Sequence, residues 1–310
     1  MVKKYQTKKK NKRNDKLDKK YKEIYQKKYN EEKQKNEHKY LDILFIDMLV
    51  EFIKLHYPNL DSRDDRRKYL LDNIVSEILI FLRSGTSYRY FRSNIKRSSL
   101  NYYIRFFSKT NLFNKFYEYL YSKYSEKNNC DNLKYLYTDT SFIINLNCLH
   151  KFTERNKYIK NKHSIKLSLL TDKNGIPIDI EFVKGNKNDS PLLREHIEKK
   201  ANMINGNKYK KNKRYKRYFM ADAGYDSKES RNILEELGLV VIIPTNKRNN
   251  TNISKLSEQE KKLYKKRIRI ENTFSKFKLF RRVRMLNERL LSTFKSLSYL
   301  AFSRILFSII

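Results

Sequence analysis

The stretch HSIKLSLLTDKNGIPIDIEFV spans residues 163–183 and has the pattern of two β-strands joined by a tight turn. Ile165, Leu167 and Leu169 alternate with polar neighbours, which is the spacing of a strand with one buried face. Asn174-Gly175, between the two strands, is a signal for a tight hairpin. The stretch therefore predicts an antiparallel hairpin.

The elements around this hairpin alternate in a way that defines a fold class. A β-rich run precedes it at 134–146, and the following segments predict, in order, a helix (188–201), a strand (217–222), a helix (226–238), a strand (239–244) and a long helix (257–278). Three strands in a meander followed by two parallel crossovers predict an α/β ribonuclease-H-like domain with a mixed five-stranded sheet over residues 133–310. The apolar segment 284–309 is expected to form a helix that packs against this sheet. Asp189 or Ser190 is expected to cap the first of these helices, and Asp226 with Glu229 to form a capping box on the second.

The N-terminal part of the chain predicts helices and no strands. Residues 1–39 carry 16 Lys or Arg against 6 Asp or Glu, so we expect a basic low-complexity tail that is disordered by itself. Residues 40–128 are expected to form an all-helical domain, with one helix over 70–83 that ends at Gly85. The order helix, glycine turn, helix is compatible with a helix-turn-helix that binds DNA. A structural or dimerising role for this unit is equally compatible.

Composition points to a polyanionic partner. The 310 residues carry a formal net charge of +36, which makes double-stranded DNA the expected partner, although AT-biased coding also enriches lysine. Cys130 and Cys148 provide neither a disulfide framework nor a zinc cluster. The sequence has no signal peptide and no apolar run of the ~20 residues that a membrane span needs. We therefore expect an intracellular, DNA-associated protein that does not enter a membrane.

Three carboxylates occupy special places in the predicted fold. Asp139 lies inside the first strand, Asp222 follows the fourth strand, and Glu271 lies in the long helix that crosses these two neighbouring strands. Carboxylates gathered closely repel one another unless a cation neutralises them, and oxygen ligands favour two Mg²⁺ or Mn²⁺ ions. Each residue also has a simpler interpretation. Asp139 can be a solvent-facing strand residue, Asp226 can replace Asp222 as the ligand, and Glu271 can be a helical partner of Arg267.

The long helix carries a stripe of functional side chains within YKKRIRIENTFSKFK, residues 264–278. Tyr264, Arg267, Glu271 and Lys278 fall within an arc of roughly 60° if the helix is continuous. One carboxylate between two cations and a tyrosine is a poor core face. It suits a surface that holds a metal ion beside a phosphate backbone.

At these residues the chain resembles the DDE transposases of bacterial insertion sequences, specifically the group numbered four and five. The spacing of Tyr264, Arg267, Glu271 and Lys278 matches the Tyr-Arg-Glu-Lys signature of that group, and YTDTS (137–141) and DAGYDS (222–227) are similar to its two aspartate motifs. The resemblance implies that Asp139, Asp222 and Glu271 form the catalytic, metal-binding triad. It further implies that Tyr264, Arg267 and Lys278 contact transposon-end DNA and that the protein works as a homodimer. In GNKNDS the group often has a histidine before Asp189, where this chain has Asn188.

The sequence thus predicts a DNA transposase that binds transposon ends, cleaves phosphodiester bonds with a metal ion and transfers the strands to a target. Two alternatives remain at this point. A structure-specific endonuclease on the same fold uses the same triad, and a domesticated, non-catalytic DNA-binding protein keeps the DNA contacts but not the chemistry.

Overall fold

The computed structural model describes residues 42–60, 69–128, 131–145, 151–205, 216–246 and 256–310. The basic tail predicted for residues 1–39 lies outside these ranges, as do Cys130 and Cys148. Within the described residues, no helix is long and apolar enough to cross a membrane.

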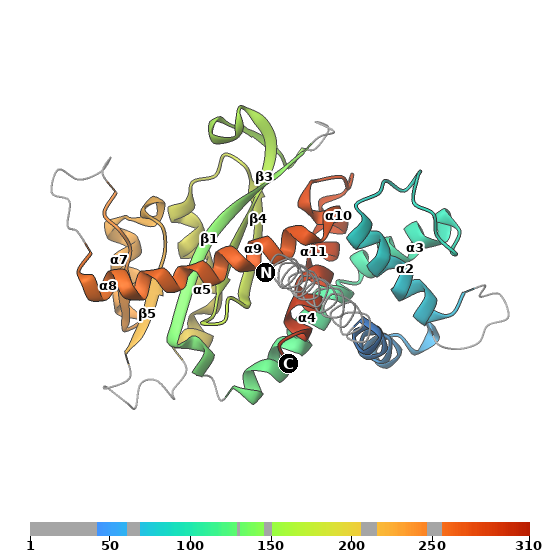
Figure 1. The fold of residues 1–310 in the computed structure, drawn as a ribbon, viewed down its shortest axis with the longest axis horizontal. Coiled ribbons are helices and arrows are strands. Elements are labelled where there is room, and N and C mark those ends of the chain that lie inside the picture. Colours follow the sequence, from blue (N-terminus) through green and yellow to red (C-terminus); the bar gives the residue numbers. More distant parts are fainter. Residues whose placement is uncertain (1–41, 61–68, 129–130, 146–150, 206–215, 247–255) are drawn as a thin grey trace, which may run out of the picture.

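The centre of the molecule is a mixed sheet (Figure 1) whose strand order confirms the ribonuclease-H-like prediction. Its strands are β1 (Tyr135–Ile144), β2 (Glu154–Asn156), β3 (Lys162–Thr171), β4 (Pro177–Lys184), β5 (Arg217–Met220) and β6 (Leu239–Ile242). β1 pairs antiparallel with β3, and β3 pairs antiparallel with β4. β5 runs parallel to β1 on the other side, and β6 runs parallel to β5. The order β4-β3-β1-β5-β6 is the predicted meander followed by two crossovers.

The sheet has six strands because the short β2 was not predicted. β2 pairs with the first residues of β3, from Lys162 to Ser164, beyond the point where β4 ends. Its three residues are Glu154, Arg155 and Asn156, so it lacks the alternating apolar pattern that predicts a strand.

Helices cover both faces of the sheet. α5 (Asp189–Ile204) and α7 (Lys228–Glu236) follow β4 and β5 as the crossover helices. α9 (Ile268–Leu279) crosses in front of β1 (Figure 1). Successive side chains of β1 point to opposite faces, so Asp139 faces α9 whereas Thr140 faces α5.

The N-terminal helices lie to one side of the sheet. Residues 42–56 form a helix, followed by α2 (Leu71–Ser84), α3 (Arg97–Lys109) and α4 (Leu112–Lys127). α2 ends as predicted, because Gly85 takes a left-handed conformation with φ +68°. Between α9 and the C-terminus lie α10 (Arg281–Arg284) and α11 (Leu291–Phe307).

α11 joins the N-terminal helices to the sheet. It is the helix predicted over 284–309, but it packs chiefly against α4 and α3 rather than on the sheet. It reaches the sheet where the ring of Phe294 meets Phe182 of β4, with centroids 5.7 Å apart. α11 is buried nearly all round, so buried hydrophobic residues of the N-terminal helices and of the sheet form one continuous core.

Candidate active site

Asp139 lies in the middle of β1, where its side chain is 21% exposed and points toward α9. Its Oδ1 accepts a hydrogen bond from the backbone N–H of Thr140 at 2.8 Å. β1 is held in place beside it because the Thr138 hydroxyl donates to the carbonyl of Leu169 at 2.9 Å. The strand thus presents Asp139 from a rigid, central position in the sheet.

Asp222 reaches the same level of the sheet by strand register. β5 is parallel to β1 with Tyr137 opposite Met220, so Asp139 and Asp222 each lie two residues beyond a paired position. Asp222 is exposed and caps the short 3-10 helix η4 (Ala223–Tyr225) by accepting from the Ala223 N–H at 2.6 Å. The loop after a parallel strand is where α/β folds build their sites, and the structure places Asp222 there.

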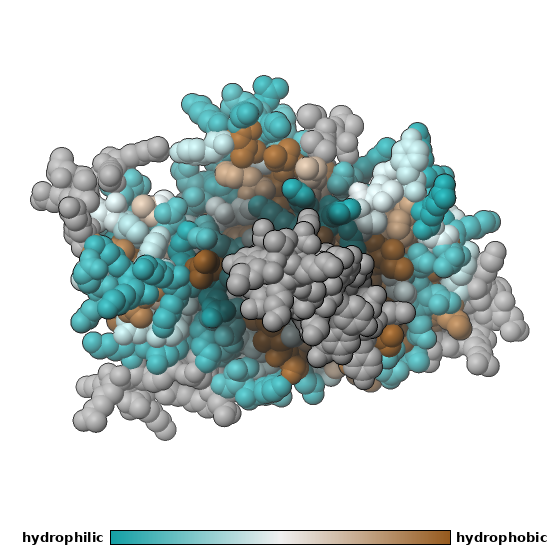
Figure 2. Space-filling model, in the orientation of Figure 1, coloured by the Kyte–Doolittle hydropathy of each residue, from teal (hydrophilic) through white to brown (hydrophobic). Residues whose placement is uncertain are grey.

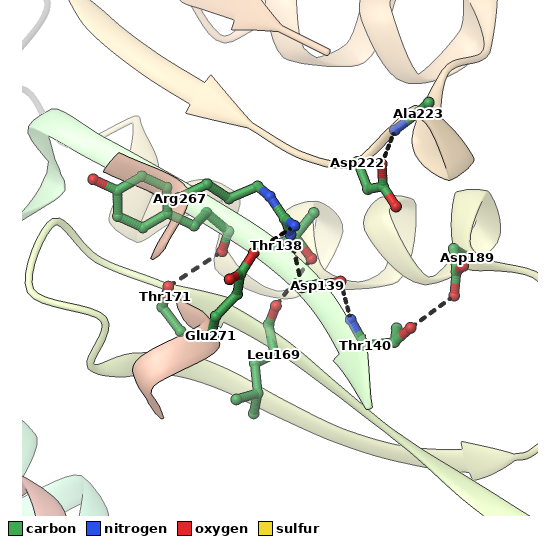
Figure 3. Close-up of polar contacts among 11 residues, drawn as sticks. Thr138, Asp139, Thr140, Leu169, Thr171, Asp189, Asp222, Ala223, Arg267 and Glu271 are labelled. Carbon is green, nitrogen blue, oxygen red and sulfur yellow. Dashed lines mark hydrogen bonds and ion pairs between the residues drawn. The ribbon is translucent and has the colours of Figure 1, made fainter. Parts of the chain in front are cut away.

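Glu271 enters the site from α9 and is connected to Asp139 by Arg267 (Figure 3). Arg267 Nη1 lies 2.7 Å from Asp139 Oδ2, and Nη2 lies 2.7 Å from Glu271 Oε1. The Arg267 side chain is 16% exposed, whereas that of Glu271 is 52% exposed. One guanidinium therefore bridges two of the three predicted carboxylates.

The segment that carries this arginine differs from the single helix expected over 257–278. α8 (Glu258–Tyr264) and α9 are separated by a 3-10 turn, η5 (Lys265–Arg267). The prediction of one continuous helix was wrong, because the two ends of the segment pack differently: α8 has no buried residue, whereas α9 buries Ile270, Phe274 and Phe277. The one-face argument therefore holds for Arg267 with Glu271 but not for the full stripe.

Tyr264 and Lys278 end up in different surroundings. Tyr264 closes α8, and the guanidinium carbon of Arg267 lies 5.8 Å from its ring centroid. Burial raises the pKa of the Tyr264 hydroxyl, and the nearby Asp222 and Asp139 raise it further. Lys278 lies at the far end of α9, where burial and the neighbouring Arg284 lower its pKa. Tyr264 thus belongs to the carboxylate cluster, and Lys278 lies beyond it.

The charged groups of the cluster are close enough to shift one another's pKa values. Burial raises the pKa of Asp139 above its ordinary value, and Asp222 adds to the shift even though Arg267 opposes it. Burial would lower the pKa of Arg267, but Asp139, Tyr264 and Glu271 together raise it. These mutual effects place Asp139, Asp222, Tyr264 and Arg267 in one electrostatic unit, with Glu271 attached through Arg267.

In this structure the carboxylates of the cluster do not form a metal site. Among the residues that the structure describes, no three acidic, histidine or cysteine side chains are close enough together to hold a metal ion. The Arg267 guanidinium lies between Asp139 and Glu271 and supplies the positive charge there. The donor atoms nevertheless fit a hard divalent cation, since all three predicted ligands are carboxylate oxygens.

Asp189 is a fourth carboxylate near the cluster, and the sequence predicted only a helix-capping role for it. Its Oδ1 accepts from Lys166 Nζ at 2.8 Å and from the Thr140 hydroxyl at 3.2 Å, directly beside Asp139. Its Oδ2 lies beside Gly224, two residues beyond Asp222. Asp189 and Ser190 were expected to cap α5, but Asn188 holds that position. The signal that identifies Asp189 is the buried Lys166 on β3, a cation in a strand that needs a partner.

Asp226 is a structural residue, although the expected reason was wrong. Ser227, not Asp226, caps α7 by accepting from the Ser230 N–H at 3.1 Å. Asp226 is buried and accepts from Arg231 Nε and from the Asn246 N–H, both at 2.8 Å. Its carboxylate is thus occupied away from the cluster, which leaves Asp222 as the candidate on this loop.

Comparison with known protein families identifies the chain. Residues 148–306 match the family model described as the transposase DDE domain, which is just over half of the 310 residues. The chain belongs to the transposase DDE domain family. The family confirms the resemblance drawn from the Tyr-Arg-Glu-Lys spacing and identifies the protein with DNA transposition. The matched region contains Asp222, Glu271 and Lys278 and begins after Asp139.

Solved structures of transposases show distant likenesses. The catalytic domain of the Mos1 mariner transposase is 15% identical, covering 55% of this chain and 87% of that chain with a TM-score of 0.27. The piggyBac transposase in a synaptic complex with hairpin DNA is 11% identical, covering 86% of this chain and 73% of that chain with a TM-score of 0.48. At these TM-scores we draw no conclusion from the likenesses, and the fold assignment is based on the strand order. No curated protein matches the sequence.

Proposed function

We propose that this protein is a DNA transposase that binds the ends of its element, cleaves them with a metal-dependent triad of Asp139, Asp222 and Glu271, and transfers the cut strands to target DNA. The proposal is carried by one observation. Arg267 connects Asp139 on the central strand with Glu271 on the crossing helix, and Asp222, in the loop after the parallel neighbour strand, is near enough to contribute to the pKa of Asp139.

Divalent metal is the cofactor that this arrangement fits. Mg²⁺ or Mn²⁺, as a pair of ions, would activate the attacking oxygen and stabilise the leaving oxygen of a phosphodiester. Asp139 and Asp222 would hold the ions from the sheet, and Glu271 from α9. The position of Asp222 supports this role, because its charge contributes to the raised pKa of Asp139, although burial is the main cause of that shift.

Arg267 would change partners when DNA and metal enter. In the free protein it neutralises Asp139 and Glu271. With a metal ion bound by the carboxylates, the Arg267 guanidinium would be able to bind a phosphate oxygen with its planar fork. Tyr264 and Lys278 would contact the same DNA. Asp189 would act as a positioning residue, because it holds the Thr140 hydroxyl and Lys166 beside the strand that carries Asp139.

The rest of the chain would supply DNA recognition. We assign the helical unit of residues 40–128 to binding of transposon ends, the residues from 133 to 310 to chemistry, and the basic tail of residues 1–39 to nonspecific DNA affinity. Two copies would act together, each on one end. The net charge of +36 over the whole chain supports a polyanionic partner. The coloured part of the face in Figure 2 is mainly hydrophilic.

The proposal is tested by incubating labelled duplexes from the DNA that flanks the coding region with protein and Mg²⁺ or Mn²⁺. Wild-type protein is expected to nick the element ends and to join them to a second duplex. Glu271→Gln is expected to abolish both reactions while it leaves DNA binding intact. Glu258→Gln is the matched control, because it removes the same charge from an exposed side chain on α8.

The outcomes separate the alternatives. Nicked ends without joined products indicate a structure-specific endonuclease. Specific end binding without metal-dependent nicking indicates a domesticated DNA-binding protein. Equal nicking by wild type and Glu271→Gln contradicts the triad.

A further inference from the structure

A hollow of about 760 Å³ lies between the N-terminal helices and the C-terminal segment. Asp139, Asp222 and Glu271 are not among its lining residues. One wall is the start of α3 and its second turn, and the other is the connection from α10 to α11. The hydrogen-bonding and cationic side chains that line it include Lys96, Arg97, Arg105, Asn101, Asn287 and Arg289.

The hollow has a concentrated positive charge. Lys96, Arg97, Arg105 and Arg289 are all exposed, and within the described chain none of them forms an ion pair with a carboxylate. Glu288 also lines the hollow, but its carboxylate is buried and bound to Arg282 Nε at 2.6 Å. A negatively charged ligand would therefore meet four available cations and no available carboxylate.

The walls of the hollow are fixed to each other by Arg282. Its guanidinium carbon lies 4.5 Å from the ring centroid of Phe81 and 5.0 Å from that of Tyr88. Its Nη1 donates to the carbonyl of Thr86 at 2.9 Å, and the ion pair with Glu288 completes its contacts. The connection to α11 is thus anchored on α2 and on the loop that precedes α3. The backbone around the hollow is therefore anchored to the core, which lowers the part of the ordering cost that comes from the backbone.

We propose that this hollow binds the phosphodiester backbone of the transposon-end DNA, as a second anchoring site apart from the carboxylates. The inference rests on the proposed transposase function. Three arginines provide planar forks that match phosphate oxygens, and neutral donors such as Asn101 and Asn287 can complete the contacts. Tyr88 and Leu290 are the large apolar side chains among the lining residues, and the other lining residues are polar or charged.

α9 and α10 connect the carboxylate cluster with the hollow along the chain. α9 leads from Glu271 to Leu279, which is ~12 Å along a helix axis, and the hollow begins beyond α10. Lys278 and Arg284 lie along this path and are close enough for Arg284 to lower the pKa of Lys278. In this proposal one end follows α9 and α10, so that the phosphates of about one turn of B-DNA, 34–36 Å long, are shared between the carboxylates and the hollow.

The test compares two variants of the full chain that each remove three positive charges. Arg97→Gln/Arg105→Gln/Arg289→Gln empties the hollow of its arginines. Lys115→Gln/Lys216→Gln/Lys228→Gln is the matched control, with exposed lysines on α4, before β5 and at the start of α7. Binding of a fluorescent end duplex is measured by anisotropy in EDTA over a range of KCl concentrations, and melting curves confirm that both variants fold.

The arginine variant is expected to bind less tightly at ~0.1 M salt, by about tenfold for each DNA phosphate that it no longer neutralises, and its log–log salt slope should fall by about 2–3. The lysine control should keep the wild-type slope. Equal slopes for the two variants overturn the proposal. It is also overturned if the arginine variant keeps its affinity for DNA but binds polyglutamate more weakly, since the hollow would then take acidic protein.

Failure of this inference is distinguishable from failure of the proposed function. If wild-type protein nicks its ends in Mg²⁺ and the slopes do not differ, the hollow alone is wrong. If the slopes differ and no nicking occurs, the hollow binds DNA and the transposase chemistry is wrong.

Discussion

The turn of the β3–β4 hairpin fixes α9, the helix that carries Glu271, and Gly175→Ala tests this contact. Gly175 has a φ of +80°, and a Cβ atom there would lie 2.7 Å from the Arg269 carbonyl oxygen and 2.7 Å from Thr273 Oγ1. The Thr273 hydroxyl also donates to the Gly175 carbonyl at 2.6 Å. Glu271 lies between Arg269 and Thr273 in the sequence, so the hairpin turn contacts α9 two residues to either side of the predicted metal ligand.

The expected loss of stability has three parts. An alanine in the left-handed conformation costs roughly 1–2 kcal/mol, and the clash with backbone adds about 1–3 kcal/mol. Weakening the Thr273 hydrogen bond adds about 1 kcal/mol. We therefore expect Gly175→Ala to lower the free energy of unfolding by roughly 3–6 kcal/mol.

Gly238→Ala is a matched control for the conformational part alone. Gly238 has a φ of +68°, and nothing lies within 4 Å of the position of its Cβ. Its substitution should cost about 1–2 kcal/mol. Urea unfolding followed by circular dichroism measures both variants, and at a temperature where both are folded Gly175→Ala should also nick DNA more slowly. Unfolding free energies that agree within about 0.5 kcal/mol would refute the contact between hairpin and helix.

Three further predictions concern individual charged side chains. Arg267→Gln leaves the poorly exposed Asp139 without its cation, so Mg²⁺ should raise the melting temperature of this variant more than that of wild type; an equal shift in both would contradict competition between the guanidinium and the metal. Arg282→Met leaves the buried carboxylate of Glu288 without its ion pair, which should cost about 3–5 kcal/mol in urea unfolding, and Glu288→Gln in the same chain should recover part of this loss. Burial raises the pKa of Asp172 from 3.8 to about 6, so its contribution to stability is full below its unfolded pKa and is lost as pH rises through the folded pKa. Between about pH 4 and about pH 7, the unfolding free energy of wild type should therefore fall by roughly 3 kcal/mol relative to Asp172→Asn.

The sheet could be predicted because its signals are local. The alternation of Ile165, Leu167 and Leu169 and the Asn174-Gly175 turn specify the hairpin without help from distant residues. The parallel strands β5 and β6 are short apolar runs bounded by helices, which is the usual sequence of a crossover. β2 was missed because its polar residues become a strand only through pairing with β3.

The sequence predicted which elements carry the three carboxylates, but not the side-chain contacts between them. Their places on β1, after β5 and on the last helix follow from element order, whereas the bridge by Arg267 depends on side-chain geometry across 128 residues. The break of the long helix at η5 results from packing that a periodic pattern does not encode. Asp189 was left out because its partners Lys166 and Thr140 lie on other strands.

The central claim is that Asp139, Asp222 and Glu271 hold divalent metal against the phosphate that is cleaved. The most direct test replaces a non-bridging oxygen of that phosphate by sulfur, because Mg²⁺ binds sulfur poorly and the softer Mn²⁺ binds it better. The account predicts that wild-type protein cleaves the sulfur-substituted end slowly in Mg²⁺, that Mn²⁺ restores the rate, and that Glu271→Gln cleaves in neither metal. Equal cleavage of the oxygen and sulfur substrates in Mg²⁺, with a rate-limiting chemical step, would contradict it.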